Sequence, residues 1–198
     1  MSDILSLQRR PVVAQLVRDR GSLVVVAGLG ATAWDLAAAG DHPLDFPLWG
    51  AMGGAAMVGL GLALAQPGRK VLVITGDGEQ LMGMGALATI AVQHPRNLRI
   101  VVLDNERYGE TGLQPTHTAF GVDLASVALA CGFPHARTVR DAEEIEALCA
   151  DIHHRDELFL AVVKVALTDD PRVLPPRDGA YLKNRLRTAL LGEQAAVE

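Results

Sequence analysis

The stretch that decides the fold is KVLVITGDGEQ, residues 70–80, in which an apolar run ends in Gly76-Asp77-Gly78. Its aliphatic residues are continuous rather than alternating, which is typical of strands buried on both faces of a parallel sheet. The two glycines allow a sharp turn and a close approach of the backbone to an anion. We interpret this stretch as a buried strand that leads directly into a ligand-binding turn.

Three further apolar runs of the same kind lie on either side of it, at Leu23–Ala27, Arg99–Leu103 and Phe159–Val165. Strand-like and helix-like stretches alternate along the chain, which predicts an α/β domain with a mostly parallel sheet flanked by helices. The helix-like stretches are Val12–Asp19, Ala51–Ala65, Gln80–Gln93, Val122–Cys131 and Ala142–His153.

The C-terminal part of the chain has a different character. Residues 169–178, DDPRVLPPRD, are rich in proline and read as a linker. In residues 181–191 the leucines Leu182, Leu186 and Leu190 recur at helical spacing, which predicts one apolar stripe of a short helix. We therefore expect a domain over residues 1–168, followed by a linker and a helix over residues 169–198.

Composition excludes several classes of protein. The net charge of −5 over 198 residues disfavours a nucleic-acid binder, and two cysteines are too few for a disulfide scaffold or an iron–sulfur cluster. The start of the chain lacks the apolar core of a signal peptide, so we expect a cytoplasmic protein. The most apolar run, Ala51–Ala65, is shorter than the about 20 residues of a membrane span. Its glycines suggest close packing against a partner subunit or a cofactor.

Two polar side chains stand at the ends of neighbouring predicted strands. Asp77 is a hard oxygen ligand in the glycine turn, and Asn105 supplies an amide oxygen after the run 99–103. With a backbone carbonyl and a diphosphate, these oxygens fit an octahedral Mg²⁺ site. The simpler alternative is a strand-to-helix turn in which Asp77 caps the helix.

The wider pattern resembles a known family. Gly76-Asp77-Gly78 followed by Asn105-Glu106-Arg107-Tyr108-Gly109 resembles the thiamine diphosphate (ThDP) motif. With residues 49–53, 76–91 and 110–118, the region from about Leu23 to Lys164 resembles the diphosphate-binding (PP) domain of the phosphonopyruvate and sulfopyruvate decarboxylases. The resemblance implies a ThDP-binding PP-type fold and the cofactors ThDP and Mg²⁺. It implies a carbon–carbon lyase in which C2 of the cofactor attacks a 2-oxo acid, carbon dioxide leaves and an aldehyde is released.

The resemblance also implies roles for individual residues. Asp77, Asn105 and the carbonyl of Arg107 would bind Mg²⁺, and Met52 would bend the cofactor, although a core methionine is the simpler alternative. His117 could reach a substrate carboxylate or donate a proton, and it could equally be a surface histidine. The cofactor-binding set as a whole is Gly28, Gly30, Ala31, Thr32, Gly50, Met52, Gly76, Gly78, Glu79, Tyr108, Gly109, Glu110 and Thr111.

Two departures from the family pattern affect the expected chemistry. Asp104 stands where the family often has asparagine, and we expect its side chain to point away from the ion. No basic residue occurs from Val24 through Gly40, whereas a doubly charged phosphonate or sulfonate group needs an arginine or lysine clamp. We therefore expect a less charged 2-oxo acid, or a clamp that comes from another subunit.

A ThDP site of this kind needs a second, pyrimidine-binding (PYR) domain of ~150 or more residues, which this chain does not contain. The resemblance therefore implies a separate PYR-domain (alpha) subunit that supplies the activating glutamate. We expect a hetero-oligomer with at least two copies of each chain, a small 2-oxo acid as substrate, and neither nucleic acid nor membrane as partner.

Two alternatives remain open. The subunit could serve carboligation, in the manner of acetolactate synthase, which product analysis with and without an added aldehyde would distinguish. It could also be a non-catalytic regulatory subunit that retains the fold, in which case replacing Asp77 by alanine would leave the activity of the complex unchanged.

Overall fold

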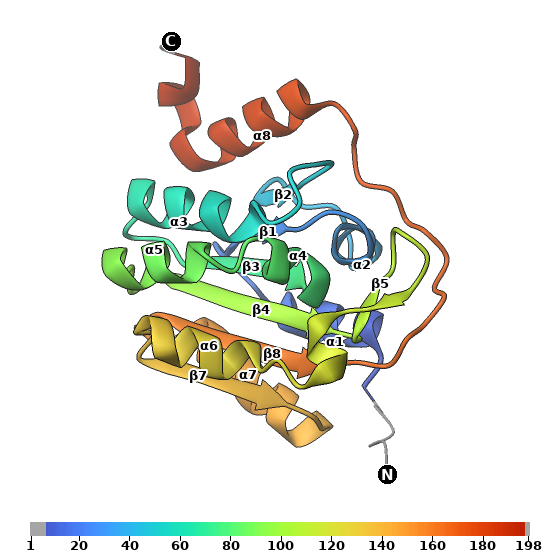
Figure 1. Ribbon diagram of the computed structural model, residues 1–198. Helices are drawn as coiled ribbons and strands as arrows, with labels where there is room; N and C mark the ends of the chain where they lie inside the picture. The colour runs from blue at the N-terminus through green and yellow to red at the C-terminus, as the bar shows by residue number, and fades with distance from the viewer. Residues whose placement is uncertain (1–6, 197–198) are drawn as a thin grey trace.

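The computed structural model describes residues 7–196 and confirms the predicted α/β class. Six strands form one sheet in the order β2-β1-β3-β4-β8-β7, and all neighbouring strands are parallel (Figure 1). The strands are β1 (Val24–Ala27), β2 (Asp45–Pro47), β3 (Val71–Gly76), β4 (Leu98–Asp104), β7 (His135–Val139) and β8 (Phe159–Lys164).

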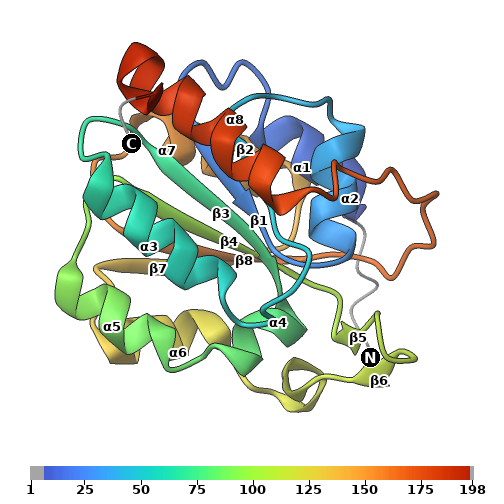
Figure 2. The same ribbon diagram turned by 90° about the horizontal axis from the view of Figure 1, so that it is seen from above.

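Helices cover both faces of this sheet, so the molecule has three layers (Figure 2). One face packs against α3 (Ala55–Ala65), α5 (Ala86–Gln93), α6 (Leu124–Cys131) and α8 (Gly179–Leu191). The other face packs against α1 (Arg9–Leu16), α2 (Ala31–Ala38) and α7 (Ala142–His154). Within residues 7–196, no helix is both long enough and apolar enough to cross a membrane.

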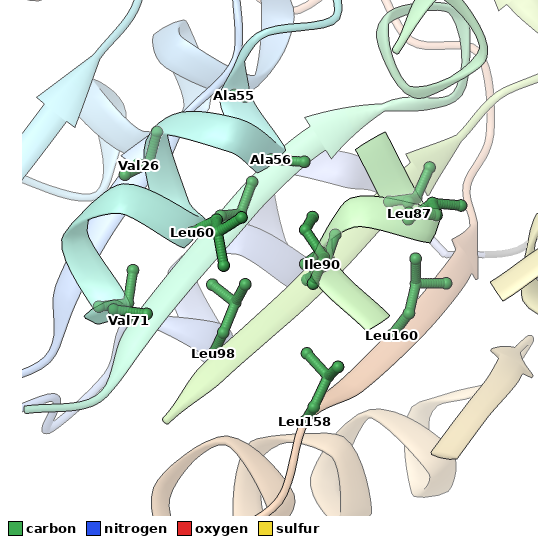
Figure 3. Close-up of a cluster of buried hydrophobic side chains, with 14 of the residues drawn as sticks. Val26, Ala55, Ala56, Leu60, Val71, Leu87, Ile90, Leu98, Leu158 and Leu160 are labelled. Atoms are coloured by element: carbon green, nitrogen blue, oxygen red, sulfur yellow. The ribbon is translucent and has the colours of Figure 1, made fainter. Parts of the chain in front are cut away.

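The two-sided packing explains the continuous apolar runs in the sequence. Along β3, Val71 packs with Leu60 and Ile90 into the core beneath α3 and α5 (Figure 3), and Val73 belongs to the same core. Leu72 and Ile74 pack into the core on the opposite face of the sheet. All four side chains are fully buried. A strand with helices on both faces needs apolar residues at successive positions, which is the pattern that residues 71–74 display.

The Ala51–Ala65 stretch is helical only from Ala55, because a turn precedes the helix: Ala51 and Gly53 have φ angles of 59° and 90°. The predicted helix at residues 80–93 is instead two helices, α4 (Asp77–Met82) and α5, separated by a glycine-containing break at residues 83–85. The turn places Met52 outside the helix, and the break gives the Gly-Asp-Gly motif a short helix of its own.

Among the strands of the six-stranded sheet and the α-helices, three elements were not anticipated from the sequence, namely α2, β2 and β7. Both strands lie at the edges of the sheet and are poor in the continuous aliphatic pattern: β2 is Asp-Phe-Pro and β7 is partly exposed. Edge strands need less burial, so their sequences carry a weaker strand signal. The helix α2 begins at Ala31, within the stretch after Gly28 that was expected to form a glycine loop.

The strand order fixes where a ligand can bind. From β1 the chain moves to β2 on one side and then returns to β3 on the other side, so the order reverses between β1 and β3. In open parallel sheets, the crevice beyond the carboxyl ends of the strands at such a reversal is the usual ligand site. Gly28 and Gly76 lie at these two carboxyl ends.

After β8 the chain runs along the outside of the molecule and ends in α8, which packs beside β2 (Figure 1). Arg185 of α8 forms an ion pair with Asp41 at 2.7 Å and donates to the carbonyl of Asp45 at 3.0 Å. The division at residue 168 into a domain and a tail stays a prediction. The expectation about the start of the chain falls largely on residues 1–6, outside the described residues.

Candidate cofactor and metal site

A cavity of about 680 Å³ opens at the carboxyl ends of the central strands. It is lined by the start of α2, the turn at Met52, the Gly-Asp-Gly motif, the loop after β4 and the segment after β8. The expected site residues that line it are Ala31, Thr32, Met52, Gly76, Asp77, Gly78, Glu79, Asn105, Arg107, Tyr108, Gly109, Glu110 and Thr111. Gly28, Gly30 and Gly50 are not among the lining residues, although Leu29, between two of them, is.

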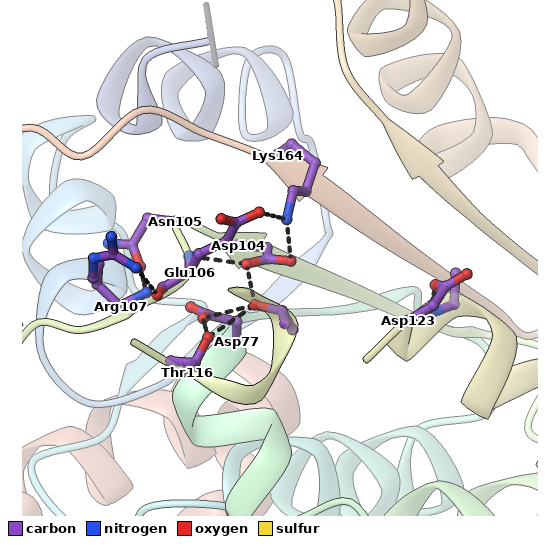
Figure 4. A network of polar contacts seen from close by, with 10 residues as sticks. Asp77, Asp104, Asn105, Glu106, Arg107, Thr116, Asp123 and Lys164 are labelled. Atoms are coloured by element: carbon purple, nitrogen blue, oxygen red, sulfur yellow. Dashed lines mark hydrogen bonds and ion pairs between the residues drawn. The ribbon is translucent and has the colours of Figure 1, made fainter. Parts of the chain in front are cut away.

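Asp77 is the most deeply placed acidic group in this cavity, with 2% of its surface exposed. It is the first residue of α4, whose N-cap is Gly76, so it does not act as the helix cap. Thr116 donates its hydroxyl proton to Asp77 Oδ2 at 2.6 Å, and Thr118 Oγ1 lies 3.4 Å from the same oxygen (Figure 4). The other carboxylate oxygen has no side-chain donor within residues 7–196.

The electrostatic surroundings of Asp77 shift its protonation equilibrium toward the neutral form in the absence of a cation. Burial raises the pKa of Asp77 to about 6, and the nearby charge of Asp104 adds to this effect, while the Thr116 hydrogen bond opposes it. A divalent cation would reverse the balance, because a positive charge beside a buried carboxylate favours ionisation.

Asn105 follows β4 directly and faces the same cavity. Its Oδ1 accepts a hydrogen bond from the backbone N–H of Arg107 at 2.9 Å, which closes a tight Asx turn. An amide oxygen has two lone pairs, so a second interaction with a cation is still available. Within this turn Glu106 has a φ angle of 62°, a left-handed conformation that residues other than glycine adopt infrequently.

Asp104 is turned toward protein partners. Lys164 of β8 forms an ion pair with Asp104 Oδ2 at 2.9 Å, and Thr118 donates to Oδ1 at 2.8 Å (Figure 4). Burial lowers the pKa of Lys164, but hydrogen bonds to Glu106 and Asp104 outweigh that effect and raise it. The carboxylate of Asp104 is therefore balanced by a lysine that lies 60 residues further along the chain and that no local motif marks.

Gly78 and Tyr108 pack closely enough to explain the second glycine of the motif. A Cβ atom on Gly78 would lie 2.6 Å from Cδ1 of the Tyr108 ring, closer than such atoms approach. The Tyr108 hydroxyl in turn lies 3.3 Å from Nδ1 of His117. His117 is exposed and is not a cavity-lining residue, so it reaches the site only through Tyr108.

Glu79 has its side chain inside the protein, with 3% of its surface exposed. Its carboxylate accepts from the Thr75 hydroxyl at 2.9 Å and from the backbone N–H of Ala55 at 3.4 Å. Burial raises the pKa of Glu79. The carboxylate thus connects α4 to the start of α3 beside the Met52 turn, a role beyond the backbone contact expected from the sequence. Met52 itself is 37% exposed, which does not fit a core methionine.

Three arginines line the cavity, and of these only Arg107 was expected at the site, for its carbonyl. Arg9 forms an ion pair with buried Asp35. Arg172, in the segment after β8, lies over the Trp34 ring at 4.6 Å and pairs with no carboxylate of the described residues. No local sequence signal marks Arg9 or Arg172, because each lies far along the chain from the glycine motif.

The donor set fits a diphosphate-bound Mg²⁺ better than a metal ion held by the protein alone. In the part of the chain that the structure describes, no cluster of three or more His, Cys, Asp or Glu side chains could hold an ion. Mg²⁺ in nucleotide and diphosphate sites needs only one or two carboxylates, since phosphate oxygens and water complete its octahedral shell. Asp77 and Asn105 offer one carboxylate and one amide oxygen for a set of this kind.

Comparisons with known proteins define the family to which the chain belongs. Residues 27–163 match the family described as thiamine pyrophosphate enzyme, C-terminal TPP binding domain. The chain belongs to this family. Sulfopyruvate decarboxylase subunit beta of Methanothermobacter thermautotrophicus is 40% identical over 147 residues, which cover 74% of this chain and 78% of that protein.

Two further comparisons extend this result. Phosphonopyruvate decarboxylase of Streptomyces hygroscopicus is 40% identical over 158 residues, covering 79% of this chain but 36% of that longer protein. The crystal structure of benzoylformate decarboxylase from Polynucleobacter necessarius superposes with a TM-score of 0.68 at 19% identity, covering 86% of this chain and 36% of that chain. At this identity the superposition shows the fold alone. The expected family resemblance is thereby confirmed, whereas the individual site residues stay predictions.

Proposed function

We propose that this chain is the diphosphate- and Mg²⁺-binding subunit of a two-subunit ThDP-dependent decarboxylase that acts on a 2-oxo acid. The observation that carries the proposal is the position of Asp77 and Asn105. They lie at the ends of neighbouring strands, line one cavity and have oxygen atoms available to a cation. When bound, ThDP supplies the electron sink that allows the carboxylate of a 2-oxo acid to leave as carbon dioxide.

The residues of this chain have distinct tasks in the proposal. Asp77, Asn105 and the carbonyl of Arg107 bind the cation, and the backbone of Gly78 and Glu79 binds the diphosphate. Met52, exposed in the cavity, provides the apolar surface against which the cofactor bends. Its turn is held by the buried carboxylate of Glu79 through the N–H of Ala55.

Exposed apolar side chains on α3, α4 and α5 support the need for a partner subunit. On α3, Met57 and Leu64 are 41% and 51% exposed on the side where Gly61 also faces open space. Met82 and Val92, at the end of α4 and on α5, are 58% and 82% exposed. We assign this α3–α5 face to contact with a PYR-domain subunit, which would also supply the activating glutamate.

The cavity also bears on the choice of substrate. The N-terminal glycine loop lacks a basic residue, but Arg172 reaches the same cavity from the segment after β8 and has no carboxylate partner among the described residues. A 2-oxo acid with a second anionic group, as named for the sulfopyruvate and phosphonopyruvate relatives, is therefore compatible with this chain.

The proposal is tested by combining the purified chain with its PYR-domain subunit, ThDP and Mg²⁺, and by measuring carbon dioxide release from 2-oxo acids. We expect activity only when both subunits are present, and we expect Asp77→Asn to abolish it together with ThDP binding. The control is Asp156→Asn, which changes an exposed carboxylate paired with Arg96 on the surface.

The outcomes separate the alternatives. If the mixed subunits never bind ThDP, the proposal is wrong. If Asp77→Asn leaves the activity of the complex unchanged, the site is vestigial and the chain is a regulatory subunit. If an added aldehyde is converted to a longer hydroxyketone at the expense of aldehyde release, the subunit serves carboligation.

A further inference from the structure

Lys164 and Asp104 lie directly opposite each other at the ends of two paired strands. They are register partners at the last position of β4 and β8, and neighbouring residues in parallel register project to the same face. The side chains are 9% and 4% exposed, and Lys164 Nζ lies 2.9 Å from Asp104 Oδ2. A buried carboxylate of this kind needs a paired charge, since an isolated one is strongly unfavourable.

The same lysine also contacts the residue on the other side of Asn105. Lys164 Nζ lies 2.5 Å from Glu106 Oε1, so one ammonium group joins Asp104 and Glu106. Glu106 has a φ angle of 62°, which costs conformational energy for a residue with a side chain. The backbone N–H of Glu106 in addition donates to Asp104 Oδ1 at 3.0 Å.

These contacts enclose the predicted metal ligands. Asn105 lies between the two residues that Lys164 holds, and Arg107, whose carbonyl is the third predicted ligand, follows Glu106 in the same turn. Thr118 extends the network from Asp104 Oδ1 to Asp77, at 2.8 Å and 3.4 Å (Figure 4). A change in the position of Lys164 would therefore be transmitted to Asn105 through Asp104 and Glu106, and to Asp77 through Thr118.

We propose that Lys164 is a positioning residue for the metal loop. By holding Asp104 and Glu106 on both sides of Asn105, it fixes the orientation of the amide and carbonyl oxygens that meet the divalent cation. It also neutralises the second carboxylate of the site, so that Asp104 neither competes for the cation nor turns into the cavity. This inference rests on the proposed Mg²⁺–ThDP site, but the contacts themselves belong to the chain without ligands.

The experiment first removes the charge of Lys164 and then also removes the charge of Asp104, which Lys164 balances. In Lys164→Met, the affinity for Mn²⁺, used as a spectroscopic replacement for Mg²⁺ in the presence of ThDP and the partner subunit, is expected to fall about tenfold or more. The double variant Asp104→Asn/Lys164→Met pairs neutral side chains and is expected to recover most of this loss. Adding Glu106→Gly to Lys164→Met is expected to recover part of it, because glycine adopts positive φ without strain.

A second measurement does not depend on the cofactor. Hydrogen exchange of the backbone amides of Glu106 and Arg107, in the chain without ligands, is expected to accelerate in Lys164→Met and to slow again in the double variant. Lys183→Met is the control, since it makes the same substitution at an exposed position of α8.

The outcomes distinguish this inference from the proposed function. If the wild-type complex binds no Mn²⁺ with ThDP, the proposed function fails, and the exchange measurement still decides whether Lys164 orders the loop. If the wild type binds Mn²⁺ and Lys164→Met binds it equally well, or if only the melting temperature falls, Lys164 is merely structural and the inference is overturned. Failure of the double variant to recover affinity would also contradict it.

Discussion

The hydroxyl of Thr116 lies 2.6 Å from Asp77 Oδ2, and it connects the loop after β6 (Gln114–Pro115) to the glycine motif after β3. Both residues are almost completely buried. The contact therefore fixes one oxygen of the proposed metal-binding carboxylate, whose residue lines the cavity.

We expect Thr116→Val to weaken binding of ThDP with Mg²⁺ by about tenfold, because Asp77 would lose the donor that orients it. Thr116→Ser keeps the hydroxyl and is expected to bind like the wild type. Calorimetric titration of the two-subunit complex with ThDP measures the difference. Equal affinities for the valine and serine variants would show that the hydrogen bond has no orienting role.

Of two glycines in α3, Gly59 faces the core and Gly61 faces open space. Their alanine variants should therefore change the free energy of unfolding in opposite directions. A Cβ atom on Gly59 would collide with Cγ2 of Val73 and lie 3.3 Å from Cδ1 of Leu98, so we expect Gly59→Ala to lower the free energy of unfolding by about 1–3 kcal/mol. Gly61 has open space around it, and Gly61→Ala is expected to stabilise the isolated chain by about 0.5–1 kcal/mol.

Chemical denaturation of the two variants measures these changes. Because Gly61 lies on the α3–α5 face, we also expect Gly61→Ala to weaken association with the PYR-domain subunit, which analytical ultracentrifugation would detect. Unchanged association would place the partner on a different surface.

The buried carboxylate of Asp45 should make stability depend on pH. Burial raises its pKa to about 6, although the ion pair with Arg20 at 2.7 Å opposes the shift. Since the folded-state pKa exceeds the unfolded value, this group stabilises the fold fully at low pH, and the contribution is lost as the pH rises through about 6. The decrease attributable to Asp45 is at most about 3 kcal/mol between pH 4 and pH 7.

Asp45→Asn should remove this part of the pH dependence, whatever its effect on stability at a single pH. Urea denaturation of both proteins at pH 4, 5, 6 and 7 provides the comparison. Parallel profiles for the wild type and the variant would contradict the prediction.

Loss of the Arg172 side chain should lower kcat/KM more for substrates with a second anionic group than for other substrates. We expect Arg172→Ala to lower kcat/KM for 3-sulfopyruvate by about tenfold or more, because a hydrogen bond between two charged groups is lost, and to leave 2-oxobutanoate nearly unaffected. Arg177→Ala is the matched control. Arg177 lies over the Trp49 ring at 5.2 Å in the same segment but is not a cavity-lining residue.

A decrease of equal size for both substrates would assign Arg172 a structural role in the segment after β8. A decrease for 3-sulfopyruvate in Arg177→Ala as well would assign the effect to displacement of the whole segment.

Much of the fold and the centre of the site could be predicted from local sequence. Continuous aliphatic runs mark β1, β3, β4 and β8 because strands covered on both faces need apolar residues at every position. The pair Asp77 and Asn105 could be anticipated because the carboxyl ends of parallel strands meet at one edge of a sheet. The edge strands β2 and β7 escaped prediction because partial exposure relaxes this requirement.

The sequence by itself therefore determined the class of fold, the glycine turn and the two oxygen-bearing residues of the proposed metal site, since each depends on a short continuous pattern. Only the tertiary structure decided which distant residues complete the site. Lys164 meets Asp104 through the register of β4 and β8, and Arg172 enters the cavity because the segment after β8 runs past α2. Such contacts follow from strand order and chain path, which no local pattern encodes.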